Sequence, residues 1–306
     1  MTTKIDLIST QGLHRHQVLD LLSLAGQFKQ QAANKTVDTS QALKGKIVAS
    51  CFFEASTRTR LSFETAAIRL GAQIIGFASD AMTSISKGET LQDSIRMVSY
   101  YADLIVIRHP KEGSAQLAAK VSNKPVINAG DGSNQHPTQA LTDLLTIQAC
   151  QPQLEGLSIA LVGDLKYSRT IRSLVQLCAL FKMRLFLVSP PALSLAESIC
   201  DELKWQGVRF SHHQALSEVI PRVDILYMTR IQQERLSGNE QFLFKEQPFC
   251  LTPTLLQQAQ SHLKVLHPLP RLNEIDLAVD QTPHAYYFTQ AENGLYMRQA
   301  VLEYLA

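Results

Sequence analysis

The chain has 306 residues, of which 45% are hydrophobic, and its 29 basic and 27 acidic side chains nearly cancel. This length exceeds what one domain usually holds and predicts two domains. The small net charge, without a basic run, argues against nucleic acid as a partner. No stretch approaches the roughly 18 uncharged apolar residues of a membrane span, and no leader pattern opens the sequence, so we expect a cytoplasmic protein without a membrane partner.

The five cysteines are widely spaced and form neither a CxxC pair nor a His/Cys cluster. They are Cys51, Cys150, Cys178, Cys200 and Cys250. An odd number at such spacing argues against a disulfide framework and against a zinc site. We therefore expect reduced core cysteines and no metal.

Short apolar segments alternate with amphipathic segments in the first half of the chain. The pattern predicts strands near 47–53, 73–77, 103–107 and 125–128, and helices near 14–31, 58–70, 89–101 and 114–121. A longer helix is expected over 137–149, with Pro137 in its first turn. This alternation is typical of a parallel sheet with right-handed crossovers.

The alternation begins again after Gln151 and Pro152. It predicts strands near 157–162, 184–188, 208–210, 224–228 and 264–266, helices near 168–182, 195–206 and 214–220, and a last helix from about 293 to 305. The fold class expected is α/β, with two doubly wound domains that have parallel sheets and are joined by interdomain helices. We place the first domain at 1–136, completed by the C-terminal helix at about 290–306, the linking helix at 137–149 and the second domain at 150–285.

The segment Ser56-Thr57-Arg58-Thr59-Arg60 joins a predicted buried strand to a predicted helix. A helix N-terminus offers unpaired N–H groups and partial positive charge, and this one adds two guanidiniums that the helix dipole would repel. A bound phosphate would offset that repulsion. The alternative is that Ser56 only caps the helix and the arginines form a solvated face, with Arg60 paired to Glu64 one turn later.

Further polar side chains follow other predicted strands, where the ligand crevice of a doubly wound fold lies. Arg108 has a fork that can hold phosphate or carboxylate, although either Arg108 or the adjacent His109 could be structural. His136, at a helix start, can donate to a carbonyl oxygen that becomes negative during acyl transfer, and Gln139 can accept from an amide NH₂. A purely structural role is the alternative for His136.

Two features of the second half indicate recognition of a small ligand. Arg169 and Arg230 favour a dicarboxylate, unless distant carboxylates pair with them. Leu269 and Pro270, in an extended proline-rich segment, offer carbonyl acceptors to an NH₂ group, unless the segment is only a rigid turn.

Four motifs together resemble the aspartate/ornithine carbamoyltransferases, and the likeness runs almost end to end. They are Ser56-Thr57-Arg58-Thr59-Arg60, Arg108-His109-Pro110, His136-Pro137-Thr138-Gln139 and His267-Pro268-Leu269-Pro270. Within this family, Phe52-Phe53-Glu54-Ala55 and Met228-Thr229-Arg230 are similar to the aspartate-specific catalytic chains. Ornithine-specific members have a cysteine at the position of Pro268, so its absence favours aspartate.

The resemblance implies a reaction and an assembly. The carbamoyl group of carbamoyl phosphate passes to the α-amine of L-aspartate, giving N-carbamoyl-L-aspartate and phosphate, the committed step of de novo pyrimidine biosynthesis. Carbamoyl phosphate is expected to bind first and aspartate to enter between the domains. No metal or organic cofactor is implied. The family implies a homotrimer with shared active sites, and it allows a larger assembly with a regulatory chain.

The resemblance also implies roles for residues that contact carbamoyl phosphate. The phosphate is held by Ser56, Thr57, Arg58 and Thr59, with Arg108 bridging the phosphate and the carbonyl oxygen. The carbonyl is polarised by Thr59, Arg108 and His136, while the NH₂ group is fixed by Gln139 and the carbonyls of Leu269 and Pro270. Catalysis is assigned to Arg58, Thr59, Arg108 and His136.

L-Aspartate is expected to be bound by Arg169, Arg230, Gln232 and Lys87. Of these, Lys87 is supplied together with Ser84 by a neighbouring chain. The loop from Thr83 to Glu89 is one residue shorter than in the enteric type and has one lysine instead of two, and Ser168 stands where glycine is common. The shorter loop bears on how Lys87 is aligned with the lysines of the family.

Two other functions stay open at this point. The chain could carbamoylate another amino acid, and assays with aspartate, ornithine and N-acetylornithine would separate these substrates. It could also be a catalytically silent scaffold or carbamoyl phosphate binder. The intact phosphate motif, Arg108, His136 and Arg230 argue against a silent homologue, which would not need them all.

Overall fold

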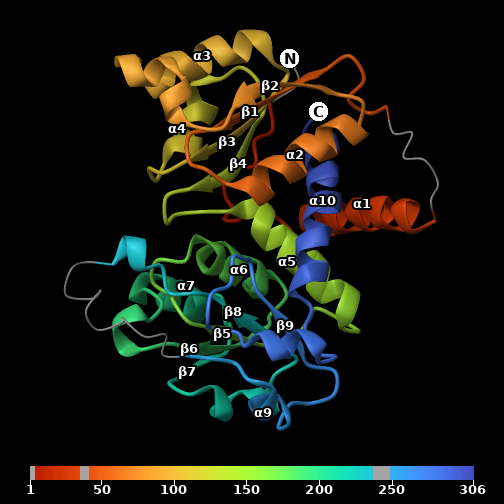
Figure 1. Cartoon of the computed structure of the whole chain (residues 1–306), viewed down its shortest axis with the longest axis vertical. Coiled ribbons are helices and arrows are strands. Elements are labelled where there is room, and N and C mark those ends of the chain that lie inside the picture. The colour runs from red at the N-terminus through yellow and green to blue at the C-terminus, as the bar shows by residue number, and fades with distance from the viewer. Residues whose placement is uncertain (1–3, 35–40, 237–248) are drawn as a thin grey trace. The chain divides into compact units, whose positions relative to one another are not determined.

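The structure is a computed structural model, and it describes residues 4–34, 41–236 and 249–306. The chain divides into two compact units (Figure 1). Unit 1 comprises Met1–Leu145 and Glu292–Ala306, and unit 2 comprises Thr146–Ala291. Two helices, α5 (Pro137–Cys150) and α10 (Tyr287–Leu305), contain residues of both units.

Unit 1 is built on a parallel four-stranded sheet in the order β2-β1-β3-β4. The strands are β1 (Ile47–Phe52), β2 (Gln73–Phe77), β3 (Leu104–His109) and β4 (Val126–Asp131). The helices are α1 (Arg15–Ala33), α2 (Thr57–Arg69), α3 (Leu91–Tyr101) and α4 (Ser114–Val121), with 3₁₀ turns η1 (Asp80–Met82) and η2 (Ser84–Lys87). Side chains of α3 and α4 pack with one face of β1 and β3 in a common core, and α2 lies on the other face (Figure 1).

Unit 2 is built on a parallel five-stranded sheet in the order β7-β6-β5-β8-β9. The strands are β5 (Ser158–Val162), β6 (Arg184–Val188), β7 (Phe210–His213), β8 (Ile225–Met228) and β9 (Lys264–Leu266). The helices are α6 (Arg169–Leu180), α7 (Glu197–Trp205) and α9 (Pro253–Leu256). Short 3₁₀ turns are η3 (Pro191–Leu193), η4 (Leu216–Glu218), η5 (Ile220–Arg222), η6 (Gln233–Arg235) and η7 (Leu277–Gln281).

Each sheet has a point where the strand order reverses. In unit 1 the chain leaves β1 for the edge strand β2 and then returns to β3 on the other side of β1. In unit 2 it leaves β5 for β6 and β7 and returns to β8 on the other side of β5. The predicted α/β class with two parallel sheets is confirmed. Ligands in such folds bind beyond the carboxyl ends of the strands at this reversal.

Several sequence predictions differ from the structure, among them two helices and the burial of one cysteine. The helix expected over 214–220 is instead the pair of 3₁₀ turns η4 and η5, because Pro221 has no N–H to continue an α-helix. The last helix begins at Tyr287 rather than near 293, and the Tyr287 ring is fully buried in the core of unit 2. Cys250 is exposed rather than in the core.

Candidate active site

The junction between β1 and α2 leaves the first helical turn open to a ligand. Ser56 is the N-cap residue, but its side chain accepts no backbone N–H and donates instead to Thr59 Oγ1 at 3.0 Å. Thr59 is buried and Arg58 is exposed. Ser56 is thus not the simple cap that the alternative required, since the N–H groups that a cap would engage are not engaged by it.

The two arginines of the motif differ in their contacts. Arg60 Nε donates to Glu64 Oε1 at 2.7 Å, and the same oxygen accepts from Ser50 Oγ at 3.0 Å. The ion pair between Arg60 and Glu64, which the sequence left as an alternative, is confirmed. Arg60 therefore pairs within its own helix, whereas Arg58 is the arginine of this motif that we expect to bind the ligand.

Arg108 is the second-last residue of strand β3, directly beside β1. It pairs in register with Phe52, and its side chain is largely buried. Arg108 Nη1 donates to the Ala129 carbonyl at 3.3 Å, and Arg108 Nε lies 3.3 Å from Glu54 Oε2. Glu54 therefore holds the guanidinium at the end of β1, a contact between residues that lie 54 positions apart in the sequence.

The loop before His136 is held by one buried carboxylate. Asp131 Oδ1 accepts from Asn128 Nδ2 at 2.8 Å and from the Gln135 N–H at 3.1 Å, and Asp131 Oδ2 accepts from the Gly113 N–H at 2.9 Å. His136, itself buried, follows this loop and immediately precedes α5. Because Asp131 pairs with His109 of β3, the ends of β1, β3 and β4 meet at one edge of the sheet.

Ser84 and Lys87 lie in the 3₁₀ turn η2 of unit 1, and both are exposed. Gly88 follows with a φ of 97°, which ends the turn in the left-handed conformation that glycine favours. Ile85 packs against the core of unit 1 and anchors the turn. The segment predicted as a polar loop is thus a short ordered turn.

Unit 2 places two arginines at the ends of adjacent strands. Arg169 opens helix α6 after β5 and is buried, and Arg230 follows β8 and is half-buried. Strands β5 and β8 pair in register, with Val162 opposite Met228. The two residues expected to bind dicarboxylate are therefore brought to the same reversal point of the sheet.

Asp164 connects the two loops that carry these arginines. Its Oδ1 accepts from the Tyr167 N–H at 2.8 Å in the loop before α6, and its Oδ2 accepts from the Gln232 N–H at 3.3 Å after β8. Its own N–H donates to Thr229 Oγ1 at 3.2 Å. Burial raises the pKa of Asp164, and the N–H donors act in the opposite direction. Asp164 therefore holds the loop before α6 and the loop after β8 together.

The close approach of the two loops requires a glycine. Gly163 has a φ of 110°, and a β-carbon there would lie 2.3 Å from the Thr229 carbonyl oxygen. No side chain fits at that distance. The end of β5 can therefore lie against the end of β8 only with glycine at this position.

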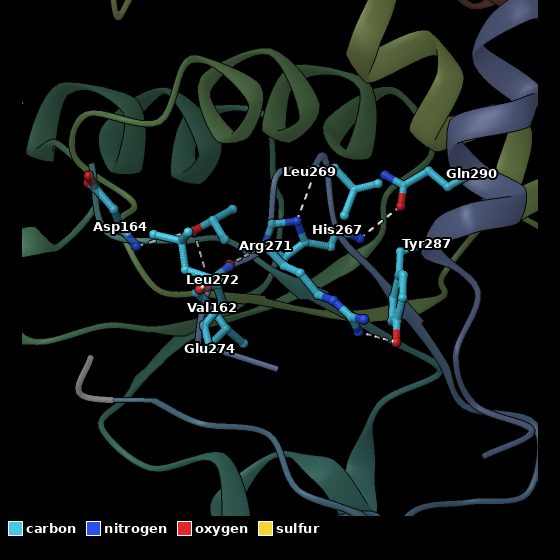
Figure 2. A network of polar contacts seen from close by, with 10 residues as sticks. Val162, Asp164, His267, Leu269, Arg271, Leu272, Glu274, Tyr287 and Gln290 are labelled. Atoms are coloured by element: carbon cyan, nitrogen blue, oxygen red, sulfur yellow. Dashed lines mark hydrogen bonds and ion pairs between the residues drawn. The ribbon is translucent and has the colours of Figure 1, made fainter. Parts of the chain in front are cut away.

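A network of buried polar contacts supports the segment after β9 (Figure 2). His267 Nε2 lies 2.7 Å from Glu274 Oε1, and His267 Nδ1 accepts from the Leu269 N–H at 2.8 Å. The His267 N–H donates to Gln290 Oε1 at 2.8 Å. Leu269 has a φ of 54°, a conformation that a residue with a β-carbon adopts only when its surroundings hold it, and its bond to Pro270 is cis.

The far end of the same segment is anchored by Arg271. Its two terminal nitrogens each donate to Asp280, both at 2.5 Å. Arg271 Nη1 also donates to the Tyr287 hydroxyl at 2.8 Å (Figure 2). This hydrogen bonding with Asp280 raises the pKa of Arg271. The carbonyls of Leu269 and Pro270 are thus fixed from both sides.

Two family models match consecutive parts of the chain. Residues 5–149 match the carbamoyl-P binding domain of the aspartate/ornithine carbamoyltransferases, and residues 155–305 match their Asp/Orn binding domain. The chain belongs to the aspartate/ornithine carbamoyltransferase family.

Relatives within this carbamoyltransferase family cover nearly the whole chain. An aspartate carbamoyltransferase catalytic subunit of Vibrio campbellii is 52% identical over 299 residues, which are 97% of this chain and 94% of that protein. The corresponding subunit of Chromobacterium violaceum is 52% identical over 284 residues, 90% of this chain and 94% of that protein.

Solved structures of family members have the same fold. The Trypanosoma cruzi aspartate transcarbamoylase in complex with carbamoyl phosphate superimposes with a TM-score of 0.92 at 36% identity, covering 98% of this chain and 96% of that one. The catalytic subunit of M. jannaschii aspartate transcarbamoylase gives 0.88 at 43% identity, covering 98% and 97%.

One cavity of this carbamoyltransferase lies away from the predicted site residues. A cavity of about 270 Å³ in unit 1 is lined by residues 5–9 and 11–13, parts of α1, Gln116 of α4 and the end of α10, and by none of the predicted site residues. Within the three described ranges, no cluster of three or more His, Cys, Asp or Glu side chains could hold a metal ion. No helix in those ranges is long and apolar enough to cross a membrane.

Proposed function

We propose that this chain transfers the carbamoyl group of carbamoyl phosphate to the α-amine of L-aspartate, releasing phosphate. The observation that carries the proposal is the convergence of Ser56–Thr59, Arg108 and His136 at the ends of three neighbouring strands in unit 1. Family membership and the relatives named aspartate carbamoyltransferase support the same reaction.

Carbamoyl phosphate binds with its phosphate at the start of α2. The open N–H groups and helix dipole attract the anion, and Arg58 adds charge there. Arg108 spans the phosphate and the carbonyl oxygen, and Ser56, Thr57 and Thr59 supply hydroxyls to the phosphate. In unit 2, the carbonyls of Leu269 and Pro270 accept from the NH₂ group, as does Gln139 of unit 1.

The reaction proceeds by attack of the neutral α-amine on the carbonyl carbon. Negative charge then builds on the carbonyl oxygen, which Thr59, Arg108 and His136 meet with donors fixed in advance. One such donor is typically worth roughly 3 to 4 kcal/mol. The departing phosphate accepts the amine proton. No step requires a metal or an organic cofactor.

L-Aspartate is the acceptor that the charges of unit 2 favour. Arg169 and Arg230 take its two carboxylates, with Gln232 assisting. A cationic acceptor such as ornithine would be repelled by the same arginines. Pro268 also leaves the segment after β9 without the thiol of the ornithine-specific enzymes.

The active assembly is a cytoplasmic homotrimer with shared sites, and it works in pyrimidine biosynthesis. Ser84 and Lys87, both exposed on η2, reach the site of a neighbouring chain, where Lys87 contacts aspartate. A larger assembly with a regulatory chain is compatible with this arrangement. We keep the two-domain division of 1–136 with about 290–306, the linking helix 137–149 and 150–285 as functional domains for the two substrates.

A direct assay tests the proposal. Purified protein is supplied with carbamoyl phosphate and, in turn, aspartate, ornithine and N-acetylornithine, and the carbamoylated product is measured colorimetrically. Formation of carbamoyl aspartate alone is expected. Product with ornithine instead would overturn the acceptor assignment, and absence of all products would overturn the transferase assignment.

A further inference from the structure

The amide of Gln139 has an orientation that chemistry dictates. Gln139 lies in the first turn of α5, and its Nε2 donates to Asp143 Oδ1 at 2.8 Å, one turn later. A carboxylate only accepts hydrogen bonds, so the NH₂ group of Gln139 must face Asp143. The amide oxygen is therefore turned away from Asp143, and Gln139 is half-buried while Asp143 is fully buried.

A second buried charge lies near Asp143 in the core of unit 1. Arg298 of α10 is buried, and its guanidinium lies over the Phe63 ring, 5.2 Å from the ring centroid. Burial lowers the pKa of Arg298 to about 10, although the nearby charge of Asp143 raises it. Arg298 remains cationic at neutral pH, so it can compensate the carboxylate charge of Asp143.

The Arg298 side chain needs the space left by a glycine one turn earlier in α10. A β-carbon at Gly294 would lie 2.4 Å from Arg298 Nη1 and 3.7 Å from Thr142 Cγ2. Glycine in a helix costs roughly 1 kcal/mol relative to alanine, so this glycine has a packing reason. Helices α2, α5 and α10 thus surround the opposite charges of Asp143 and Arg298. The half-buried amide of Gln139 contacts Asp143.

We propose that Asp143 is a positioning residue that fixes the Gln139 amide oxygen toward the NH₂ group of carbamoyl phosphate, and thereby selects carbamoyl over acetyl phosphate. This inference rests on the proposed function. A carbamoyl group donates two N–H bonds, whereas the methyl group of acetyl phosphate donates none. An amide oxygen held in place accepts a hydrogen bond from carbamoyl phosphate. Acetyl phosphate removes water from the same oxygen and gives it no hydrogen bond in return.

The competing explanation is that Asp143 serves only as a structural partner of Arg298. Loss of Asp143 would then disturb unit 1 as a whole and weaken binding of both phosphates. A positioning role predicts a selective loss, because acetyl phosphate makes no use of the amide oxygen. The two explanations therefore differ in the ratio between the ligands.

The first measurement compares wild type with Asp143→Asn. An asparagine at this position can donate as well as accept, so the Gln139 amide is free to turn its NH₂ group toward the ligand. The KM for carbamoyl phosphate is expected to rise about tenfold or more, the size of one lost hydrogen bond. The inhibition constant of acetyl phosphate against carbamoyl phosphate is expected to change by less than about twofold, since the lost bond is one it never makes.

The second measurement is a reciprocal exchange. Gln139→Glu alone faces Asp143 with a second carboxylate and is expected to raise the KM for carbamoyl phosphate by at least the same factor. In the double variant Gln139→Glu with Asp143→Asn, the asparagine NH₂ donates to the carboxylate introduced at position 139, whose other oxygen accepts from the ligand. The KM should return to within about threefold of wild type.

The exchange also guards against misfolding, because the double variant keeps one carboxylate and one amide in place. Thermal unfolding is recorded for all variants. Parallel rises in the KM for carbamoyl phosphate and the inhibition constant of acetyl phosphate, or no recovery in a folded double variant, would overturn the inference. Wild-type protein that makes no carbamoyl aspartate would overturn the proposed function instead, so the two failures are distinguishable.

Discussion

His267 and Glu274 form a buried pair, with His267 Nε2 2.7 Å from Glu274 Oε1 and both side chains 1% exposed. Because His267 Nδ1 accepts from the Leu269 N–H, the imidazole proton must reside on Nε2, where it faces the carboxylate. Burial lowers the pKa of His267, as do Arg271 and Arg230, against the opposing effect of Glu274. The histidine is thus neutral and locked in one tautomer.

This pair predicts that the protein loses stability in mild acid. The pKa of His267 is lowered below its unfolded value of about 6.5, so the unfolded chain binds more protons once the pH falls below that value. Burial acts most strongly on Glu274 and would raise its pKa, but the contributions of His267 and of backbone N–H donors together outweigh burial, and the net pKa is lowered. Its stabilising contribution is therefore lost only at still lower pH, as the pH falls through that lowered pKa.

Urea unfolding of wild type and His267→Asn at pH 7, 6 and 5, at fixed protein concentration, measures this effect. Breaking the buried pair is expected to cost about 3 to 5 kcal/mol at pH 7, and the variant should lose less further stability between pH 7 and 5 than wild type. His212→Asn, which removes an exposed histidine, serves as the control. Equal pH slopes in wild type and His267→Asn would contradict the assignment of a neutral His267.

The two arginines of the phosphate motif are expected to differ sharply on mutation. Arg58→Ala should lower kcat by about 10²- to 10³-fold with a smaller change in KM, because the positive charge of Arg58 stabilises the negative charge that builds on the departing phosphate. Arg60→Ala should leave kcat almost unchanged and cost about 0.3 to 0.5 kcal/mol of stability, the worth of its half-buried helix pair with Glu64.

Steady-state kinetics and thermal unfolding of both variants provide the measurement, and each variant is the control for the other. Equal losses of kcat would show that the ion pair of Arg60 does not separate the two side chains functionally. An unchanged kcat in Arg58→Ala would remove the phosphate site from the start of α2.

The sequence predicted most of this architecture because its signals are local. Strand β1 is a short apolar run, and α2 has an apolar face, so both followed from periodicity. The strand-end positions of Arg108 and Arg169 followed from the general geometry of doubly wound folds. The stretch 214–220 was wrongly predicted as a helix because its apolar pattern is compatible with one, and Pro221 lies just after its end.

The supporting carboxylates could not be predicted, because their partners are distant in sequence. Asp164 contacts Gln232, 68 residues later, and Glu54 contacts Arg108 across two strands. The sequence gives only a weak indication of their roles, because Asp164 and Glu54 are simply acidic residues close to strand ends. Asp143 contacts Gln139 at helical spacing, so only the burial of its charge against Arg298 was beyond the reach of the sequence.

Gly163 gives a stability prediction in unit 2. Alanine there would meet the Thr229 carbonyl at 2.3 Å in a left-handed backbone, so we expect a loss of about 3 kcal/mol and a raised KM for aspartate. Gly156→Ala is the matched control, since its φ is 74° but no atom lies within 4 Å of the added carbon, and it should cost only about 1 kcal/mol. Thermal and urea unfolding of both variants separate backbone strain from the clash, and similar losses would refute the close approach.

The proposed position of Lys87 in the site of a neighbouring chain predicts that two inactive variants regain activity when their chains are mixed. If each site combines Arg58 of one chain with Lys87 of its neighbour, every mixed ring of three built from Arg58→Ala and Lys87→Ala chains contains one site with both residues intact. Random reassembly puts three quarters of the trimers in the mixed class, each with one of its three sites intact, so about a quarter of wild-type activity should return.

The reassembly is done by dissociating and mixing the two inactive variants, with product formation measured before and after. Arg58→Ala mixed with Arg108→Ala is the control, because both residues belong to the same unit 1 site and no ring can restore it. Recovery in the first mixture but not in the control is the expected result. Failure of the first mixture to regain activity, with reassembly verified by native mass spectrometry, would place Lys87 outside a shared site and leave η2 as an exposed surface turn.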